Sequence, residues 1–377
     1  MNQIKIPDWK RAVIKVGSSL VAPDGKGISS QYTLTIANFI IQNRNLGREI
    51  ILVSSGAVAA GIAKQGSSKT KSNRTIPEKQ AFAAIGQSLL MQSWSRFFDF
   101  PSAQMLLTMD GLHNRERYVN AKNTLNELLN LKTLPIVNEN DTVAVEELKV
   151  GDNDNLAAHV AVMAEADILI ICTDIVGLYD ANPIKNKNAK LIPFVEKINS
   201  KIFALAEDTK NPNATGGMKT KIEAAEKATS AGIDTLIING KSSELFNEMM
   251  KGKFHGTFFK KLNAPVAAKK HWLTHAIQTE GKVIIDDGAR NALINKGASL
   301  LPSGIIKVEG YFSVGSSISI SVLDGEDERV IAKGITQYNS QDLDKIKGKK
   351  SNEIEKTIGY FSNKEVIHRS DMVLINN

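Results

Sequence analysis

Two lysines stand beside glycines at points where the chain could meet an anion. Lys15 lies in the string IKVGSS, two residues before a glycine–serine turn, and Lys221 ends the string ATGGMKTK, just before a helix-forming stretch. Glycine lets backbone N–H groups approach an anion closely, and a helix N-terminus carries partial positive charge. The second string lacks the spacings G-x-x-x-x-G-K-[ST] and G-x-G-x-x-G of the known phosphate loops. Taken alone, either lysine could equally be a solvated surface charge.

Serine, amide and carboxylate side chains gather at two further points. In VSSGAVAAG, Ser55 lies between an apolar run and small residues suited to the start of a helix. In VNENDTVAVEELKVGDNDNLAAHVA, Asp141 follows an apolar run, and Asn153 and Asp154 open the next helical stretch. Helix capping accounts for one such residue, but not for two clusters of carboxylates and amides. Together these groups can bind the ammonium and carboxylate groups of an amino acid, and the spacing of a calcium-binding EF-hand is absent.

Other kinds of catalytic site are not indicated. The six histidines are scattered without the spacing of metal ligands, and no Ser/His/Asp or Cys/His pattern is present. The single cysteine, Cys172, lies in the apolar string ILIICTD, which favours a buried structural thiol over a reactive one. The expected chemistry is therefore stabilisation of charge, without a nucleophilic side chain and without a metal site built by the protein.

The pattern between residues 10 and 240 alternates strands with helices. Continuous apolar runs separated by helical periodicity are typical of a parallel sheet covered on both faces. Gly47 is placed to end the helix that begins near residue 30. In such sheets ligands bind beyond the carboxyl ends of the strands, where the polar strings described above lie. The expected strands are RAVIKV, EIILVSS, AQMLLT, TLPIVNEN, DILIICTD and DTLIING.

The sequence pattern changes after residue 240. We read residues 241–270 as a last helix followed by a linker, because they are rich in lysine and contain Pro265. After about residue 278, short alternating runs with glycine, aspartate and serine turns predict a small β-rich domain of about 80 residues. A chain of 377 residues is long enough for two or three domains.

The net charge of +7 does not indicate nucleic-acid binding. Residues 241–270 hold 7 basic and 2 acidic side chains, whereas residues 271–377 hold 13 and 14. The excess therefore lies in one short segment, which suits a solvated connector better than a groove for a polyanion. The N-terminal stretch has no apolar signal region, no apolar run approaches the ~20 residues that span a bilayer, and one cysteine suits a reducing compartment. We expect a soluble cytoplasmic protein.

These strings, in this order, resemble the amino acid kinase family, and the resemblance runs along almost the whole chain. The strings that carry it are IKVGSS, SSGAVAAG, QMLLT, RERYVNAKNTL, PIVNENDTVA, KVGDNDNLAA, TDIVGLYDANP and TGGMKTKIEAA. Further on, DDGARNALINKGASLLPSGI is similar to the start of a PUA domain. The resemblance implies an α/β fold, a three-layer αβα sandwich with a mainly parallel central sheet, followed by a small β-rich PUA domain. The implied parts are a catalytic domain (1–262), a linker (263–278), the PUA domain (279–360) and a C-terminal tail (361–377).

The resemblance is nearest to the members that phosphorylate the γ-carboxylate of L-glutamate. It implies that the chain makes L-glutamyl 5-phosphate, the first step of proline biosynthesis, with ATP as co-substrate and Mg²⁺ arriving on the ATP phosphates. A glutamate side chain has a reference pKa of ~4.3, so the nucleophile is already ionised and needs no general base. It needs relief from repulsion as two anions approach, which lysines and backbone N–H groups supply.

The motifs of the family imply a role for each site residue. Lys15 and Lys221 would contact the transferred phosphate, and Asp154 would orient both lysines. Glutamate would be held by Ser55, Asp141 and Asn153. The sequence leaves open whether Lys219 faces phosphate or solvent. ATP would be bound by Lys15, Thr173, Asp174, Thr215, Gly216, Gly217, Met218, Lys219, Thr220 and Lys221.

Two alternatives stay open at this point. Family members that act on acetylglutamate, aspartate, carbamate or uridylate share the two lysines, although an appended PUA domain favours the members that act on glutamate. A PUA domain could also bind RNA, against which the balanced charge beyond residue 270 argues. The resemblance further implies proline as a feedback inhibitor, a homo-oligomer (dimer or tetramer), and channelling of the product to glutamate-5-semialdehyde dehydrogenase.

Overall fold

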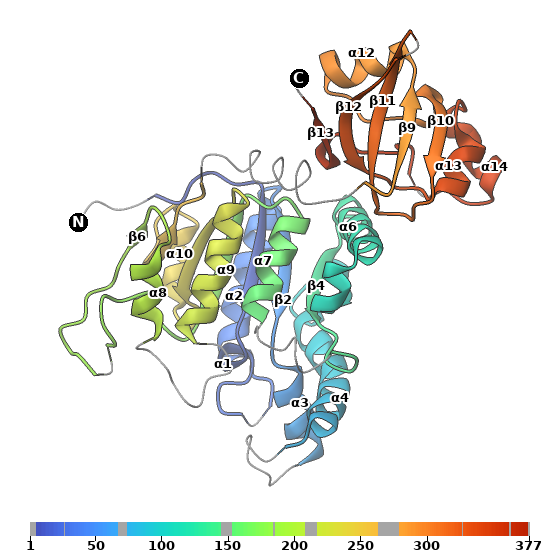
Figure 1. Cartoon of the computed structure of the whole chain (residues 1–377). Coiled ribbons are helices and arrows are strands. Elements are labelled where there is room, and N and C mark those ends of the chain that lie inside the picture. Colours follow the sequence, from blue (N-terminus) through green and yellow to red (C-terminus); the bar gives the residue numbers. More distant parts are fainter. Residues whose placement is uncertain are drawn as a thin grey trace. The chain divides into compact units, whose positions relative to one another are not determined.

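The computed structural model describes most of the 377-residue chain (Figure 1). The chain forms two compact units, one of residues 1–112 and 122–263 and the other of residues 113–121 and 264–377. The domain boundaries expected from the sequence stay a prediction, and the expected linker 263–278 lies outside the described residues. The described residues are 5–25, 27–66, 74–144, 153–183, 185–207, 217–262, 279–325, 327–361 and 363–375.

An eight-stranded sheet forms the centre of the first unit, in the order β3-β4-β2-β1-β5-β7-β8-β6. Neighbouring strands pair in parallel, except that β7 and β8 are antiparallel. Strand β5 is buried at every position, as expected for an apolar run that is covered on both faces. The mainly parallel sheet expected from the sequence is confirmed. Its strands are β1 (Arg11–Val16), β2 (Glu49–Ser54), β3 (Ser102–Leu107), β4 (Leu134–Glu139), β5 (Ile168–Thr173), β6 (Phe194–Val195), β7 (Asp234–Asn239) and β8 (Gly256–Phe259).

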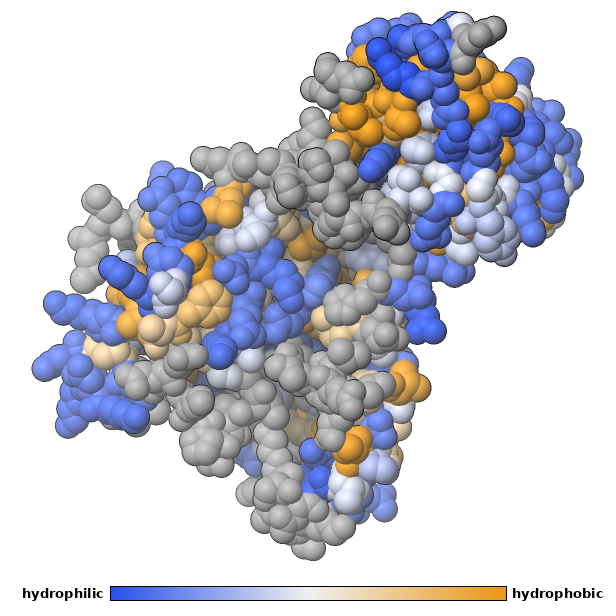
Figure 2. All heavy atoms as spheres, in the orientation of Figure 1, coloured by the Kyte–Doolittle hydropathy of each residue, from blue (hydrophilic) through white to orange (hydrophobic). Residues whose placement is uncertain are grey.

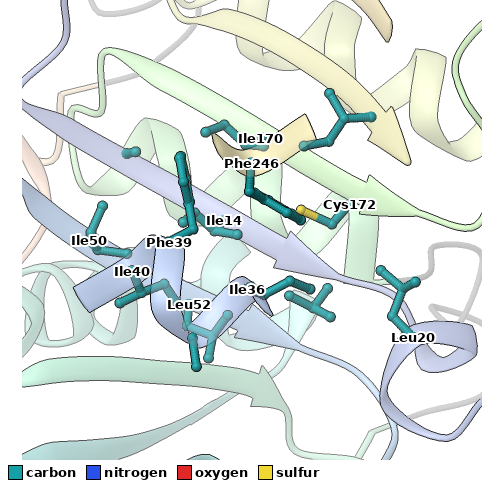
Figure 3. Close-up of a cluster of buried hydrophobic side chains, with 14 of the residues drawn as sticks. Ile14, Leu20, Ile36, Phe39, Ile40, Ile50, Leu52, Ile170, Cys172 and Phe246 are labelled. Carbon is teal, nitrogen blue, oxygen red and sulfur yellow. The ribbon is translucent and has the colours of Figure 1, made fainter. Parts of the chain in front are cut away.

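Helices cover both faces of this sheet (Figure 1). Ile14 of β1 packs in one core with Phe39 of α2 and Phe246 of α10 (Figure 3). Successive strand residues point to opposite faces, so Lys15 lies on the other face, where it contacts Asp154 of α7, which Lys221 of α9 also contacts. The sheet is therefore the middle of three layers. The helices are α1 (Ser18–Val21), α2 (Ser30–Asn45), α3 (Ala57–Gln65), α4 (Ile76–Ser95), α5 (Met109–His113), α6 (Arg115–Asn130), α7 (Asn153–Met163), α8 (Ser200–Glu207), α9 (Met218–Ser230) and α10 (Ser243–Met249).

The single cysteine belongs to the core between the sheet and α2. Cys172 of β5 is fully buried beside Leu20 and Ile170 (Figure 3). Burial raises the pKa of its thiol to about 12, because a thiolate would lose its hydration there, and the charge of Lys15 lowers the pKa only in part. The expectation of a buried structural thiol is confirmed.

Helices α3 and α4 touch at the level of their backbones. A methyl group on Gly61 of α3 would lie 1.9 Å from the carbonyl oxygen of Phe82. A methyl group on Gly86 of α4 would lie 1.8 Å from the carbonyl oxygen of Ala57, the first residue of α3. No side chain fits at either position, so the two glycines set the distance between the helices.

The helix expected from residue 30 ends as the sequence indicates, but two strands, β6 and β8, were not expected. Gly47 takes a φ of +78°, and its N–H donates to Arg44 O, as in a glycine-terminated helix. The reading of residues 241–270 as a last helix and a linker was wrong in part, because α10 is followed by the buried strand β8. This strand is only four residues long, which gives too little alternation to detect.

A five-stranded sheet in the order β10-β9-β11-β12-β13 forms the centre of the second unit. Its core includes Phe312, Ile318 and Tyr338. The β-rich character expected from the sequence is confirmed, while the helices α13 and α14 were not expected. The elements are β9 (Gly281–Ile285), α12 (Asp287–Lys296), β10 (Ile305–Gly310), β11 (Ser317–Asp324), β12 (Asp327–Ile335), α13 (Ser340–Ile346), α14 (Ile354–Ile358) and β13 (Met372–Leu374), with 3₁₀ turns at Pro302–Gly304, Ser351–Glu353 and Arg369–Asp371.

Hydrophilic residues cover most of the described surface on the face shown in Figure 2, with smaller hydrophobic areas on both units. Such areas are normal for a folded protein, whose surface always includes apolar atoms. Within the described residues, no helix combines the length and the apolar character that crossing a bilayer requires.

Candidate active site

The carboxylate of Asp154 lies between two lysine ammonium groups. Its Oδ1 is 2.6 Å from Lys15 Nζ, and its Oδ2 is 3.0 Å from Lys221 Nζ. The Asp154 side chain is fully buried, and neither lysine side chain is more than 5% exposed. Together these three side chains carry a net charge of +1. Burying charge is costly, and such clusters are characteristic of functional sites.

Three elements bring these side chains together. Lys15 is the last residue but one of β1, and Asp154 and Lys221 lie in the first turns of α7 and α9. A carboxylate is favoured in the first turn of a helix by the helix dipole, whereas a lysine is disfavoured there. The position of Lys221 is therefore explained by Asp154, whose charge offsets the unfavourable dipole.

The electrostatic balance keeps Asp154 ionised. Burial alone would raise the pKa of its carboxyl group, because the charged form loses water. The charges and hydrogen bonds of Lys15 and Lys221 outweigh burial and hold that pKa well below its ordinary value. A carboxylate with so low a pKa is a poor proton acceptor at neutral pH, so its contribution is to position the two ammonium groups.

The start of α9 is tied to α7 by a hydroxyl group. Thr220 Oγ1 lies 3.1 Å from Asp154 Oδ2 and 3.0 Å from the carbonyl oxygen of Gly217. Gly217 is the N-cap residue of α9 and has no side chain with which to cap the helix. No side chain of the N-cap residue takes up the first N–H groups of α9, which is also the case where a glycine precedes a helix that binds phosphate.

Amide and hydroxyl groups form a second part of the site, next to the first. Asn153 Nδ2 donates to Ser55 Oγ at 2.8 Å and to Asn138 Oδ1 at 2.9 Å. Because Asn153 directly precedes Asp154, this hydrogen-bonded group adjoins the lysine pair. Ser55 and Asn153 were both expected to hold the amino acid, and the structure brings them into direct contact.

The turn that carries Ser55 is held in place from both sides. Gly56 takes a φ of +113°, and a methyl group there would lie 2.8 Å from Val21 Cγ1, so only glycine fits. The preceding Ser54 accepts a hydrogen bond of 2.8 Å at its Oγ from Nε1 of the buried Trp94. Both features fix where β2 ends and α3 begins.

The other expected substrate and nucleotide residues lie at neighbouring strand ends. Asp141 is half-buried in the turn after β4. Thr173 is the buried last residue of β5, and Asp174 follows it in an exposed position. Strand β5 pairs with β1, and the N–H of Gly17 donates to Cys172 O, which brings this end of β5 close to the turn after Lys15.

The expected nucleotide loop is described only in part. Thr215 and Gly216 lie outside the described residues. Met218 is buried at the start of α9, and Lys219 is exposed while Lys221 is buried. The two lysines therefore point differently, although only Thr220 separates them.

Sequence reasoning missed the support that α4 gives to this site. Asn138 Nδ2 donates to Gln87 Oε1 at 2.8 Å, and Trp94 donates to the end of β2. Both residues lie within the long helix α4, and nothing in their spacing marks them. Within the described residues, no group of three or more His, Cys, Asp or Glu side chains is arranged to hold a metal ion.

Comparison with known proteins identifies two families along the chain. The amino acid kinase family matches residues 10–239, and the PUA domain matches residues 281–358. The first match spans more than half of the chain, and the second lies within its last hundred residues.

Curated relatives match nearly the full length. The chain is 51% identical over 374 residues to the glutamate 5-kinase of Salinibacter ruber, covering 99% of this chain and 100% of the relative. It is 48% identical over 374 residues to the glutamate 5-kinase of Idiomarina loihiensis, with the same coverage. It is 46% identical over 371 residues to the glutamate 5-kinase of Xylella fastidiosa, covering 98% and 96%. With these relatives and the family match, this chain belongs to the amino acid kinase family and carries a PUA domain at residues 281–358.

Proposed function

We propose that this protein transfers the γ-phosphate of ATP to the side-chain carboxylate of L-glutamate and forms L-glutamyl 5-phosphate. The observation that carries the proposal is the buried carboxylate of Asp154 between Lys15 and Lys221. The full-length glutamate 5-kinase relatives support the choice of glutamate as acceptor.

The chemistry of this transfer matches what the site offers. The attacking carboxylate is ionised at neutral pH, because its reference pKa is ~4.3, and it therefore needs no base. The barrier comes from bringing an anion to a polyphosphate, and preorganised cations lower it. Lys15 and Lys221 would bind the phosphoryl group in flight. Asp154 would hold both ammonium groups in place, so that little reorganisation is needed during the reaction.

The amide and hydroxyl group next to the lysines suits the amino acid. Ser55 Oγ already accepts a hydrogen bond from Asn153, so its own O–H can donate to a carboxylate oxygen. Asp141 would pair with the ammonium group of glutamate, because it is an acidic, half-buried side chain in the turn after β4. These roles of Ser55, Asn153 and Asp141 are part of the proposal.

ATP would lie over the ends of β1 and β5 and the start of α9. In this arrangement Thr173 and Asp174 line the nucleotide site, and the loop before α9 meets the phosphates. Mg²⁺ would enter with ATP, whose phosphate oxygens are its preferred kind of ligand. The proposed loop residues are Thr215, Gly216, Gly217, Met218, Lys219, Thr220 and Lys221.

A hydroxamate assay tests the proposal directly. Hydroxylamine traps an acyl phosphate, so the purified protein should form a coloured iron–hydroxamate complex only when glutamate, ATP and Mg²⁺ are all present. Release of ADP should be measured in parallel with aspartate, acetylglutamate, carbamate and uridylate as acceptors. A preference for any of these over glutamate would contradict the proposal.

Several finer properties belong to the same proposal. We place the protein in the cytoplasm, as a homo-oligomer whose activity proline inhibits at or near the glutamate site, and whose product passes to glutamate-5-semialdehyde dehydrogenase. Kinetics at increasing proline concentration test the inhibition, and light scattering tests the assembly. If proline does not compete with glutamate, the proposed overlap of the two sites is wrong.

A further inference from the structure

A chain of amide groups runs from helix α4 to Ser55, and its polarity is determined by one backbone group. The N–H of Glu139 donates to Asn138 Oδ1 at 2.9 Å, and an N–H can only donate. Oδ1 of Asn138 is thereby identified, and it also accepts from Asn153 Nδ2. Nδ2 of Asn138 must then face Gln87, whose Oε1 accepts from it at 2.8 Å.

This polarity decides what Ser55 can offer a substrate. Because Asn138 Oδ1 attracts the Nδ2 group of Asn153, the same Nδ2 group also faces Ser55 Oγ and donates to it. The Ser55 oxygen is used as an acceptor, so its proton is left to donate. A site that donates a hydrogen bond suits a carboxylate. A flipped Asn153 would turn its Oδ1 toward Ser55 and accept the hydrogen bond of the Ser55 O–H, which could then no longer donate to a substrate.

Gln87 stands at the far end of this chain of amides. Its Oε1 is used by Asn138, while its Nε2 is buried without a hydrogen-bond partner among the residues that the structure describes. The atom of Gln87 that contributes to the chain of amides is thus its acceptor oxygen Oε1. A side chain of similar length without an acceptor would leave Asn138 Nδ2 buried and unpaired, which is the costly case.

The packing of α4 keeps Gln87 in place. The residue before it, Gly86, lies against the backbone of Ala57 so closely that a methyl group would be 1.8 Å from the carbonyl oxygen. Ala57 is the first residue of α3 and follows the Ser55–Gly56 turn. The same helix contact that positions this turn therefore positions Gln87 relative to it.

We propose that Gln87 is a positioning residue for the amino acid acceptor. Its Oε1 holds Asn138 Nδ2 and so keeps the hydrogen-bond polarity that the Glu139 N–H sets through Asn138 and Asn153 to Ser55. This inference rests on the proposed function, because it assigns the polarity to binding of the glutamate carboxylate. Gln87 acts through Asn138 and need not touch the substrate.

The test compares Gln87→Met with Gln87→Glu in the full-length enzyme. Gln87→Met keeps the length and removes the acceptor. The KM for glutamate should rise about tenfold, because Asn138 Nδ2 loses its partner and the amides no longer have a fixed orientation. The KM for ATP should stay near the wild-type value. Gln87→Glu keeps an acceptor oxygen for Asn138 Nδ2 but places a second oxygen and a charge where the buried amide nitrogen lies, so its KM for glutamate should fall between those of wild type and Gln87→Met.

Two controls separate positioning from general damage. Gln92→Met alters an exposed glutamine on the same helix and should leave both KM values unchanged. Thermal unfolding confirms that each variant is folded at the assay temperature, and calorimetric titration with glutamate measures the binding constant without turnover. If Gln87→Met does not fold, Gln87→Glu against wild type and Gln87→Leu carries the comparison.

The outcomes are distinct. An unchanged KM for glutamate in Gln87→Met would overturn the inference, as would Gln87→Glu being as impaired as Gln87→Met. An equal rise of the KM values for glutamate and ATP would also overturn it, because it would indicate a general structural role. If the wild-type enzyme failed to phosphorylate glutamate, the proposed function would fall and this inference with it.

Discussion

Lysines meet carboxylates in both units of this protein, but under opposite conditions. In the first unit, one carboxylate lies between two lysines, and the three side chains are at most 5% exposed. In the second unit, Lys282 of β9 lies 3.1 Å from Glu309 and 2.5 Å from Glu328, and all three side chains are 30–35% exposed. The distances are alike, whereas the access of water differs greatly.

This difference decides what each cluster can do. Water screens the exposed cluster, where hydrogen bonds to lysine lower the pKa values of Glu309 and Glu328, and such pairs stabilise a protein little. The buried cluster is screened much less, so each of its charges depends on the others. The distances alone therefore do not show which cluster contributes more to stability and activity. Removing single charges from each cluster should show it.

Asp154→Asn should have the largest effect. It keeps the shape of the side chain and leaves two buried ammonium groups without the carboxylate between them, a loss of about 3–5 kcal/mol by analogy with broken buried pairs. Turnover should fall as well, because the lysines are no longer oriented. Thermal and urea unfolding measure the first effect and the hydroxamate assay the second. Wild-type stability in this variant would show that Asp154 does not hold the lysines.

Lys221→Met should separate activity from stability. It removes one ammonium group and leaves Lys15 and Asp154 as a balanced pair, so the melting temperature should change little. The loss of a preorganised charge should lower kcat by ~10²-fold or more. Lys64→Met, at an exposed position in the last turn of α3, is the matched control and should be fully active. Near-normal kcat in Lys221→Met would remove this lysine from the proposed mechanism.

Acid should weaken the buried cluster in a defined direction. The pKa of Asp154 is lower in the folded protein than its ordinary value of ~3.9, so between these values the unfolded chain binds more protons. The stability that Asp154 contributes is present above about pH 4 and is lost as the pH falls below it. The difference in melting temperature between wild type and Asp154→Asn should therefore shrink from pH 5 to pH 3. A constant difference would contradict the electrostatic explanation.

Lys282→Met should have the smallest effect. Although it removes the centre of the exposed cluster, water can solvate both carboxylates, and the melting temperature should shift by less than about 2 °C. Glutamate kinase activity should be unchanged. A loss of stability comparable to that of Asp154→Asn would mean that exposure does not distinguish the two clusters.

The central sheet could be predicted because its strands are long, apolar and evenly separated. Residues 11–16, 49–54 and 168–173 carry this pattern clearly. Strands β6 and β8 were not predicted because they are short. Helices α13 and α14 were not predicted because their few apolar residues, such as Leu343 and Ile354, occur in a lysine-rich stretch. Short elements are decided by tertiary packing, which a local pattern does not contain.

The candidate site could be predicted only where its residues end a strand or begin a helix. Lys15, Ser55 and Asp154 occupy such positions, and parallel strands necessarily bring their ends to one edge. Gln87 and Trp94 could not be found in this way, because they lie within α4 and reach the site through packing against α3. The backbone contact at Gly61 and Gly86 that makes this packing close has no signature in sequence spacing.

The position of Cys172 makes the native protein its own reporter of motion. It is the only cysteine in the chain, it is fully buried in β5, and burial raises the pKa of its thiol to about 12. The thiolate is the form that attacks thiol-specific reagents, so modification requires the central sheet to open and expose Cys172 to water. The rate of labelling at neutral pH then measures how often β5 opens, the strand that pairs with β1 and therefore lies next to Lys15. Ligands that bind the closed site should slow this labelling, which would give a binding measurement without any introduced probe.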